Sequence, residues 1–234
     1  MDVRPALMGN KLLAALPETD REHLRRHLRR VEVPFGEAVH TPGTRRHRIY
    51  FPVDCVFSAQ FVTAAGSGAE VASIGNEGLV GLPLLLGASG TPSRTVVQVA
   101  GSAWCGDGIV LRDEFSRSVA LQHVVLRFTE ALMIQMGQNA ACYQHHSIEQ
   151  QFCLWLLLML DRTRSSHLHV TQEFVALTLG IRREGVNEVA SRLMRDGIIR
   201  HTRGSIDVLD RARLERACCE CYGIISHEYA RLLP

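Results

Sequence analysis

The sequence contains almost no lysine, little net charge and no long apolar run. Of its 26 Lys and Arg residues only Lys11 is lysine, and the formal net charge of the 234-residue chain is +2. Overall charge therefore does not indicate a nucleic-acid partner, and any basic surface must be local. The longest apolar run, residues 152–160, is too short to cross a bilayer, and the N-terminus lacks a signal-peptide pattern. We expect a cytoplasmic protein with no membrane partner.

Several catalytic signatures are also missing. The chain shows no nucleophile elbow, no paired-carboxylate site and no Walker pattern. The glycine-rich stretch at 75–81 is not a dinucleotide fingerprint, because no helix with a trailing acidic residue follows it. These absences predict that the protein is not an enzyme.

The seven cysteines are an odd number without regular spacing, which favours a reduced compartment over a disulfide framework. Two groups attract attention as candidate metal ligands. One comprises Cys218, Cys219 and Cys221; the other, with helical spacing, comprises Cys142, His145 and His146. Neither group supplies a full ligand set, so we interpret the first as small buried side chains and the second as a surface cluster. We therefore predict no metal and no cofactor.

The apolar content of 46% and charged content of 21% are typical of a packed globular protein. Residues 10–30 have helical spacing with a break at Pro17, after which Thr19 and Glu22 fit a capping box. Residues 31–111 instead alternate short β-branched or aromatic runs with glycine and proline breaks. The runs are 31–33, 49–51, 56–62, 70–74 and 95–99. This pattern predicts an antiparallel sandwich or barrel.

Residues 112–146 contain no proline and a single glycine, Gly137, which predicts a long helix. One seam of this helix steps alternately by four and three residues: Leu121, Val125, Phe128, Leu132, Gln135 and Asn139. The seam fits either a dimer helix or an amphipathic helix lying on its own domain. Residues 147–162 form a further helix, apolar around most of its circumference, which should be buried.

Residues 171–196 carry the strongest functional pattern in the sequence. A helix-turn-helix needs a small residue where its helices cross and a turn residue that tolerates a left-handed backbone; Ala176 and Gly180 stand at these offsets. Thr171 is placed to cap the first helix. The inward positions are apolar: Val175, Leu179, Ile181, Val186 and Val189. Because all these offsets agree, the segment predicts a DNA-reading helix pair.

The outward face of the second helix is polar, and residues 198–208 predict a basic hairpin around Gly204, which matches a wing. Arginine can bond guanine, asparagine can read adenine and glutamate can accept from cytosine. The predicted DNA contacts are Thr171, Gln172, Arg182, Arg183, Glu184, Asn187, Glu188, Arg192, Arg200, His201 and Arg203. Glu188 and Arg192 form an i,i+4 pair, and Gly185 within the helix costs about 1 kcal/mol. The alternatives are a solvated charged face or a fold that docks another protein.

A β-rich first half, a long helix and a C-terminal winged helix-turn-helix together resemble the Crp/Fnr family of bacterial regulators. The motifs that carry the resemblance are the strand pair at 49–57, the Glu77-to-Gly81 turn, Arg94-Thr95 and Arg183-Glu184. The resemblance implies an α+β fold with a jelly-roll-like antiparallel β-roll sensor domain at 1–115. A dimerisation helix at 116–146 and a winged helix-turn-helix domain at 147–234 follow. It also implies a homodimer on pseudo-palindromic double-stranded DNA, with RNA polymerase as a candidate partner.

The resemblance places a small-molecule effector pocket at Gly81, Leu82, Arg94 and Thr95. Family members that bind cyclic AMP carry a glutamate directly after the glycine, whereas Leu82 stands there in this chain. A buried ribose hydroxyl without that partner costs about 1–3 kcal/mol. We therefore expect that cyclic AMP is not the effector, which is unknown or absent. The alternatives are a cyclic-nucleotide-responsive regulator and a ligand-gated protein-interaction module.

Overall fold

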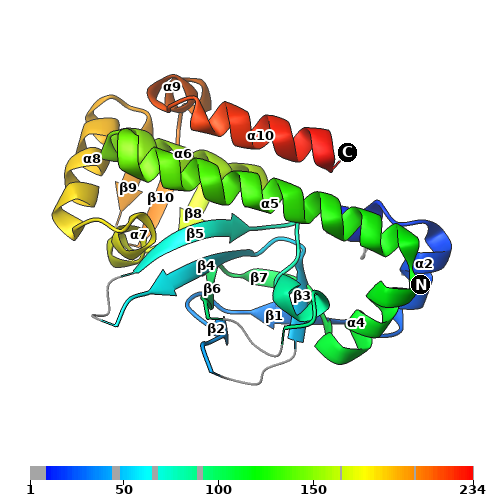
Figure 1. Ribbon diagram of the computed structural model, residues 1–234. Helices are drawn as coiled ribbons and strands as arrows, with labels where there is room; N and C mark the ends of the chain where they lie inside the picture. The colour runs from blue at the N-terminus through cyan, green and yellow to red at the C-terminus, as the bar shows by residue number, and fades with distance from the viewer. Residues whose placement is uncertain are drawn as a thin grey trace.

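The computed structural model describes residues 9–43, 48–64, 68–88, 92–163, 165–202 and 204–233. In its N-terminal half, two antiparallel sheets wrap into a β-roll (Figure 1). The first has the order β1-β7-β3, with β1 at Arg29–Val33, β7 at Gly101–Asp107 and β3 at Arg48–Pro52. The second has the order β2-β6-β4-β5, with β2 at Ala38–His40, β6 at Arg94–Val99, β4 at Val56–Val62 and β5 at Gly68–Ile74. The predicted antiparallel sandwich or barrel is confirmed.

Within the roll, the sequence pattern did not single out strands β2 and β7. β7 contains Gly101 and Gly106, and β2 has only three residues, so neither shows a β-branched run. β7 is held by its neighbours, because it pairs along its length with both β1 and β3. Pairing between distant segments thus overrides weak local propensity.

Short helices flank the roll: α1 at Lys11–Ala14, α2 at Glu18–Arg25, α3 at Leu82–Leu85 and α4 at Gly108–Arg117. The capping box predicted at Thr19 and Glu22 is wrong, because α2 begins at Glu18 with Pro17 as its N-cap. Proline has no N–H and its fixed φ suits the start of a helix, so the helix begins directly after it. The Thr19 hydroxyl instead donates to the Asp20 carboxylate at 3.4 Å.

The long helix α5, at Val119–His145, lies along β5 of the roll (Figure 1). The predicted dimer seam faces this roll: Leu121, Val125, Phe128, Gln135 and Asn139 are buried, and Leu132 is half-buried. Gln135 and Asn139 donate to the carbonyls of Ser73 and Val71, at 3.3 and 3.1 Å. The interpretation of this seam as a contact with a second chain is therefore wrong, because the sheet of the same chain already covers it.

The C-terminal half begins with α6 at Ile148–Thr163, in which residues 152–160 are all buried, as predicted. It continues with α7 at Gln172–Leu179, α8 at Arg183–Arg195 and a small sheet of order β8-β10-β9. These strands are β8 at His167–His169, β9 at Ile199–Thr202 and β10 at Ser205–Val208. The predicted hairpin is confirmed. The sequence pattern did not single out β8, whose buried Leu168 anchors it in the core.

After the hairpin the chain forms two helices, α9 at Arg211–Ala217 and α10 at Cys221–Leu232. Asp210 caps α9 by accepting from the Arg213 N–H at 2.9 Å. Cys218 then takes an extended backbone conformation and ends α9. After this break, α10 returns along α5 (Figure 1).

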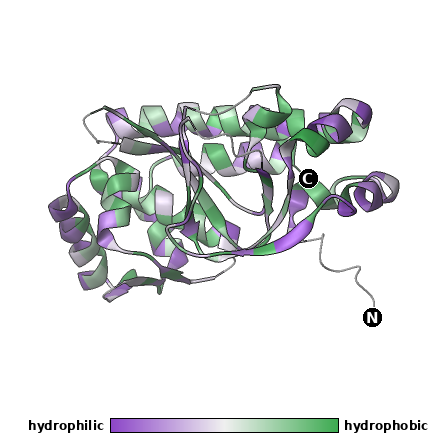
Figure 2. Cartoon of the chain, turned by 90° about the horizontal axis from the view of Figure 1, so that it is seen from below, coloured by the Kyte–Doolittle hydropathy of each residue, from purple (hydrophilic) through white to green (hydrophobic). Residues whose placement is uncertain are grey.

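Buried apolar side chains form two clusters, one within the roll and under α5, the other around α6 and the helix pair α7–α8. Along the outer helices, hydrophilic residues alternate with hydrophobic ones, as Figure 2 shows. This alternation is the pattern of helices with one face buried. Among the described residues, no helix is long and apolar enough to span a membrane.

Candidate nucleic-acid interface

The helix pair α7–α8 has the local geometry that the sequence predicts. The Thr171 hydroxyl caps α7 by accepting from the Phe174 N–H at 3.2 Å. Gly180 ends α7 with φ +65°, a left-handed conformation that glycine adopts without strain. Ala176 is buried, in the same apolar cluster as Val186 and Val189 of α8. The turn between the helices is therefore set by residues within a ten-residue stretch.

The two faces of α8 differ in polarity as expected. On the inward side, Val186, Val189 and Leu193 are buried together with Val175 and Leu179 of α7. The predicted contact residues that are exposed are Thr171, Arg182, Arg183, Glu184, Glu188, Arg192 and Arg200, while Gln172, Asn187 and His201 are half-buried. Arg203 lies outside the described residues. The outward face therefore presents arginine, glutamate and asparagine side chains to the surroundings.

Two kinds of arginine occur on this face. Arg192 pairs with Glu188 at 3.2 Å, the predicted i,i+4 pair, and also with Glu149 of α6 at 2.9 Å, which sequence reasoning missed. Among the described residues, the one side-chain partner of Arg183 is the Gln172 amide oxygen, at 3.4 Å. Within the described ranges, no carboxylate lies within ion-pair distance of Arg182 or Arg183. The guanidinium groups of Arg182 and Arg183 are thus available to a ligand, whereas that of Arg192 is already paired with two carboxylates.

The hairpin β9–β10 lies at the same end of the molecule as α8 (Figure 1). Its turn contains Gly204 with φ +88°. Arg200 is exposed on β9. Burial lowers the pKa of His201, so near neutral pH this imidazole offers a hydrogen bond rather than a positive charge.

Gly185 lies in the first turn of α8, where a side chain would fit. An added Cβ would meet Ile148 Cδ1 at 3.5 Å and Ile181 Cδ1 at 3.9 Å, both ordinary van der Waals contacts. No φ in the left-handed region requires glycine at this position. The packing of this chain on itself therefore does not explain the glycine.

A cavity of about 360 Å³ lies in the roll beneath α5. Three of the four predicted pocket residues, Gly81, Leu82 and Thr95, line it, but Arg94 does not. The remaining wall is largely apolar and includes Met133 and Met136 of α5. In the described part of the wall there is neither an arginine nor a carboxylate. Among the described wall residues, the one side chain that can carry a positive charge is His40, whose Nε2 lies 2.8 Å from the Arg48 carbonyl oxygen.

A buried polar network joins the two halves of the chain, and sequence reasoning missed it. Arg162, at the end of α6, pairs with Glu77 of the roll at 2.7 Å. Its guanidinium also donates to Ser73 Oγ at 3.0 Å and to Gln135 Oε1 at 3.1 Å. The Tyr229 hydroxyl of α10 donates to the same Gln135 oxygen at 2.8 Å. A buried charge of this kind persists because every group has a partner.

The Crp-like helix-turn-helix domain family matches residues 150–217. Three solved structures are similar to most of the chain. One, assigned to the Crp/Fnr regulators of Eubacterium rectale ATCC 33656, has a TM-score of 0.68 and 14% identity, covering 90% of this chain and 98% of its own. A CRP-family regulator from Thermus thermophilus has a TM-score of 0.67 and 17% identity, covering 81% and 95%. FixK2 from Bradyrhizobium japonicum has a TM-score of 0.66 and 14% identity, covering 82% and 98%.

No curated protein matches the sequence. The domain match coincides with α6 to α9, the part that holds the helix pair and the hairpin described above. The structural matches extend over the roll and α5 as well. The chain therefore has the fold of the Crp/Fnr transcription regulators and carries a Crp-like helix-turn-helix DNA-binding domain.

Proposed function

We propose that the protein is a homodimeric transcription regulator that reads a pseudo-palindromic operator in double-stranded DNA. The observation that carries the proposal is the exposed first turn of α8, where Arg182 and Arg183 have no described carboxylate partner. Recognition helices present their N-terminal residues to base edges in the major groove. The neighbouring hairpin offers Arg200 to the phosphate backbone.

Each predicted contact has a distinct role in this proposal. Arg183 bonds guanine, Asn187 reads adenine, and Glu184 or Glu188 accepts from cytosine. The remaining residues position the protein on phosphates: Thr171, Gln172, Arg182, Arg192, Arg200, His201 and Arg203. Specificity then depends on few residues of α8, whereas affinity and its salt dependence depend on the others.

The proposed dimer uses an exposed apolar stripe along α5 that is separate from the buried seam. Val119, Leu126 and Met133 recur every seven residues in this stripe and are 63%, 54% and 67% exposed. A heptad of exposed apolar residues is the usual contact surface between two parallel helices. The second copy would cover this stripe, while the buried seam stays on the roll.

A charge placed in this stripe tests the dimer. Met133→Glu is expected to shift the protein from dimer to monomer in analytical ultracentrifugation. Ile109→Glu puts the same charge at an exposed apolar site on α4 and should leave the dimer intact. A monomeric unsubstituted protein, or a dimer that tolerates Met133→Glu, would contradict the proposed interface.

The proposed effector is an uncharged, largely apolar small molecule bound in the roll cavity. The support is the wall itself, which brings Leu82 and Met136 into the cavity and, among its described residues, has no arginine or lysine for a phosphate. Titration with cyclic AMP in a calorimeter is expected to show no binding. Tight binding of cyclic AMP would overturn this part of the proposal.

The decisive experiment for the function itself begins with genome-wide mapping of bound DNA. Affinity for a duplex from the mapped sites should fall steeply as salt is raised, because bound phosphates release counterions. Absence of duplex binding at low salt would favour a protein-docking role for the helix pair. Transcription with purified RNA polymerase would then distinguish activation from repression. We place this activity in the cytoplasm and propose no catalytic step.

A further inference from the structure

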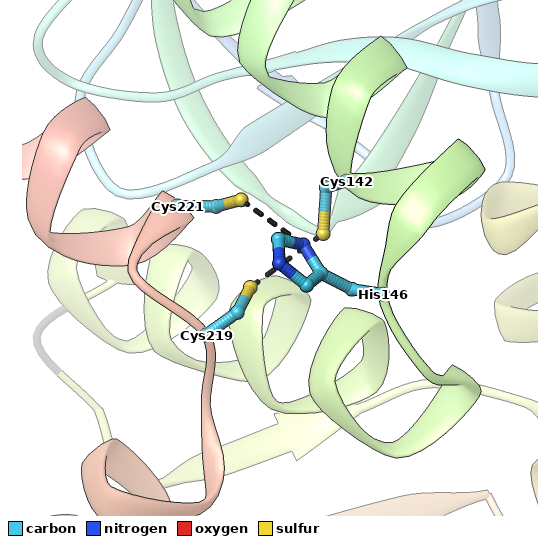
Figure 3. Close-up of side chains that lie close together, drawn as sticks. All are labelled: Cys142, His146, Cys219 and Cys221. Carbon is cyan, nitrogen blue, oxygen red and sulfur yellow. Dashed lines mark hydrogen bonds between the residues drawn. The ribbon is translucent and has the colours of Figure 1, made fainter.

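Four potential metal ligands from two distant segments meet beside the end of α5 (Figure 3). Cys142 and His146 come from the C-terminal end of α5, Cys219 lies in the break between α9 and α10, and Cys221 begins α10. Their ligand atoms all lie within 4.8 Å of one another. The interpretation of these residues as two unrelated groups is therefore wrong. The cysteine pair reaches α5 because the C-terminal helix is interrupted at Cys218.

The distances within the cluster match the edges of a tetrahedron around one ion. The sulfurs of Cys142 and Cys219 are 3.7 Å apart, and Cys221 Sγ lies 3.4 Å from His146 Nδ1. With Zn–S bonds of about 2.3 Å and Zn–N bonds of about 2.0–2.1 Å, tetrahedral edges are about 3.8 Å for two sulfurs and about 3.5 Å for sulfur and nitrogen. The four side chains are thus already arranged as the ligands of a single small ion.

We propose that Cys142, His146, Cys219 and Cys221 form a structural zinc site. Three thiolates and one imidazole are a common ligand set of structural zinc, and four protein ligands leave no open coordination position. Cys142, Cys219 and Cys221 are buried, so solvent does not compete for the ion. The neighbouring Cys218 is excluded from the set, because its sulfur faces the Gln150 carbonyl at 3.9 Å.

Groups around the ligands complete the site as zinc proteins commonly do. His146 presents Nδ1 to the cluster, and its other ring nitrogen, Nε2, lies 3.3 Å from Glu220 Oε1. A carboxylate that accepts from the second nitrogen fixes the tautomer and orientation of a zinc-bound histidine. Gln138 Nε2 donates to Cys221 Sγ at 3.1 Å, an N–H···S bond that stabilises a thiolate.

The position of the site indicates what the ion would do. The ligands Cys142 and Cys219 are 77 residues apart in the sequence, so one ion would fasten the start of α10 to the end of α5. This is the point where the long helix passes into the DNA-reading half (Figure 1). Because binding of a structural ion stabilises the folded state, zinc would hold these helices in one arrangement.

Metal analysis of the purified full-length chain tests the proposal without reference to DNA. We expect one zinc per chain after gel filtration, measured by inductively coupled plasma mass spectrometry, and a lower melting temperature after chelation that added zinc restores. Cys219→Ser should lose most of the zinc. Cys218→Ser is the matched control and should keep it, because it removes an adjacent thiol that is not among the four ligand atoms that meet.

A spectroscopic measurement covers the case in which the cysteine variant fails to fold. The unsubstituted chain, stripped of metal and loaded with Co²⁺, should show the intense visible bands and sulfur-to-cobalt charge transfer of tetrahedral thiolate coordination. Absence of zinc and of this spectrum would overturn the proposal. So would equal zinc loss in Cys218→Ser, iron in place of zinc, or a Cys142–Cys219 disulfide in the freshly purified protein.

Discussion

The arginines at the start of α8 and the arginine at the junction between the two halves differ in burial and in bonding. At the DNA-reading end, Arg182 and Arg183 are exposed and have no described carboxylate partner. At the junction between the halves, Arg162 is buried and bonded to Glu77, Ser73 and Gln135. The first arrangement leaves hydrogen-bond donors for a ligand, whereas the second uses its donors within the chain. The same residue type therefore serves binding in one place and fixes the arrangement of two halves in the other.

The junction is close-packed as well as hydrogen-bonded. A Cβ on Gly75 would come within 2.7 Å of the Arg162 side chain, so glycine makes room for it. The Gly75 N–H donates to Glu77 Oε1 at 3.0 Å, the oxygen that also accepts from Arg162. A change in the relative position of the halves would break these bonds together.

Removal of the buried arginine should have the largest effect. Arg162→Ala leaves Glu77 buried without its cation, a loss that typically costs about 3–5 kcal/mol of unfolding free energy. Urea denaturation measures this cost. Arg211→Ala, which breaks an exposed pair with Asp161, is the control and should cost about 0–1 kcal/mol. Equal destabilisation by the two substitutions would contradict the prediction that the buried arginine contributes more to stability than the exposed one.

Glu70, a buried residue of β5 near Arg162, should make the folding stability depend on pH. Desolvation raises the pKa of its carboxyl to about 7, although bonds from Ser58 and Gln98 and the charge of Arg162 oppose the shift. Since the folded chain holds the proton more tightly than the unfolded chain, stability should fall as pH rises from about 4.5 to about 7.

Glu70→Gln removes this titration and should flatten the curve of unfolding free energy against pH. In the unsubstituted chain, Glu70 should lower the unfolding free energy by roughly 2–4 kcal/mol across this pH range, since each unit of pKa shift corresponds to about 1.4 kcal/mol. Denaturation at about pH 5 and about pH 8 gives the comparison. Parallel curves for the substituted and unsubstituted chains would show that Glu70 does not titrate in this range.

On the reading side, Arg183→Ala should weaken binding to the mapped operator by about 1–3 kcal/mol and relax preference at one base pair. Its exposed position predicts little change in folding stability, in contrast to Arg162. Competition binding against single-base operator variants measures both effects. Arg112→Ala on the distant helix α4 removes the same charge and should leave operator choice unchanged; unaltered specificity in Arg183→Ala would refute the assigned role.

The smallest expected effect concerns Gly185. Alanine fits the space beside Ile148, so Gly185→Ala should stabilise the free protein by up to about 1 kcal/mol through helix propensity. Thermal unfolding tests this. If the glycine instead allows close approach of α8 to phosphates, operator affinity should fall in the more stable variant. Loss of stability would show that the α8 turn needs glycine for a reason absent from its contacts.

Much of the DNA-reading end could be predicted from the sequence because its signals are local. The cap at Thr171, the left-handed Gly180 and the inward Val186 lie within a short stretch, and backbone geometry alone relates them. Even here, the Glu149 partner of Arg192 was missed, since it comes from a different helix. One strand beside the hairpin was missed for the same reason, because β8 is a strand only through its pairing with β10.

By itself, the sequence determined the secondary-structure pattern, the helix pair with its polar outward face, and the heptad spacing of α5. Only the tertiary structure decided what lies on each side of that helix, because a period of apolar residues specifies a buried face but not the surface that buries it. The Arg162–Glu77 pair and the Cys142–Cys219 contact join residues 85 and 77 positions apart. No local spacing encodes such contacts, so the buried junction and the proposed zinc site form only once the chain is folded.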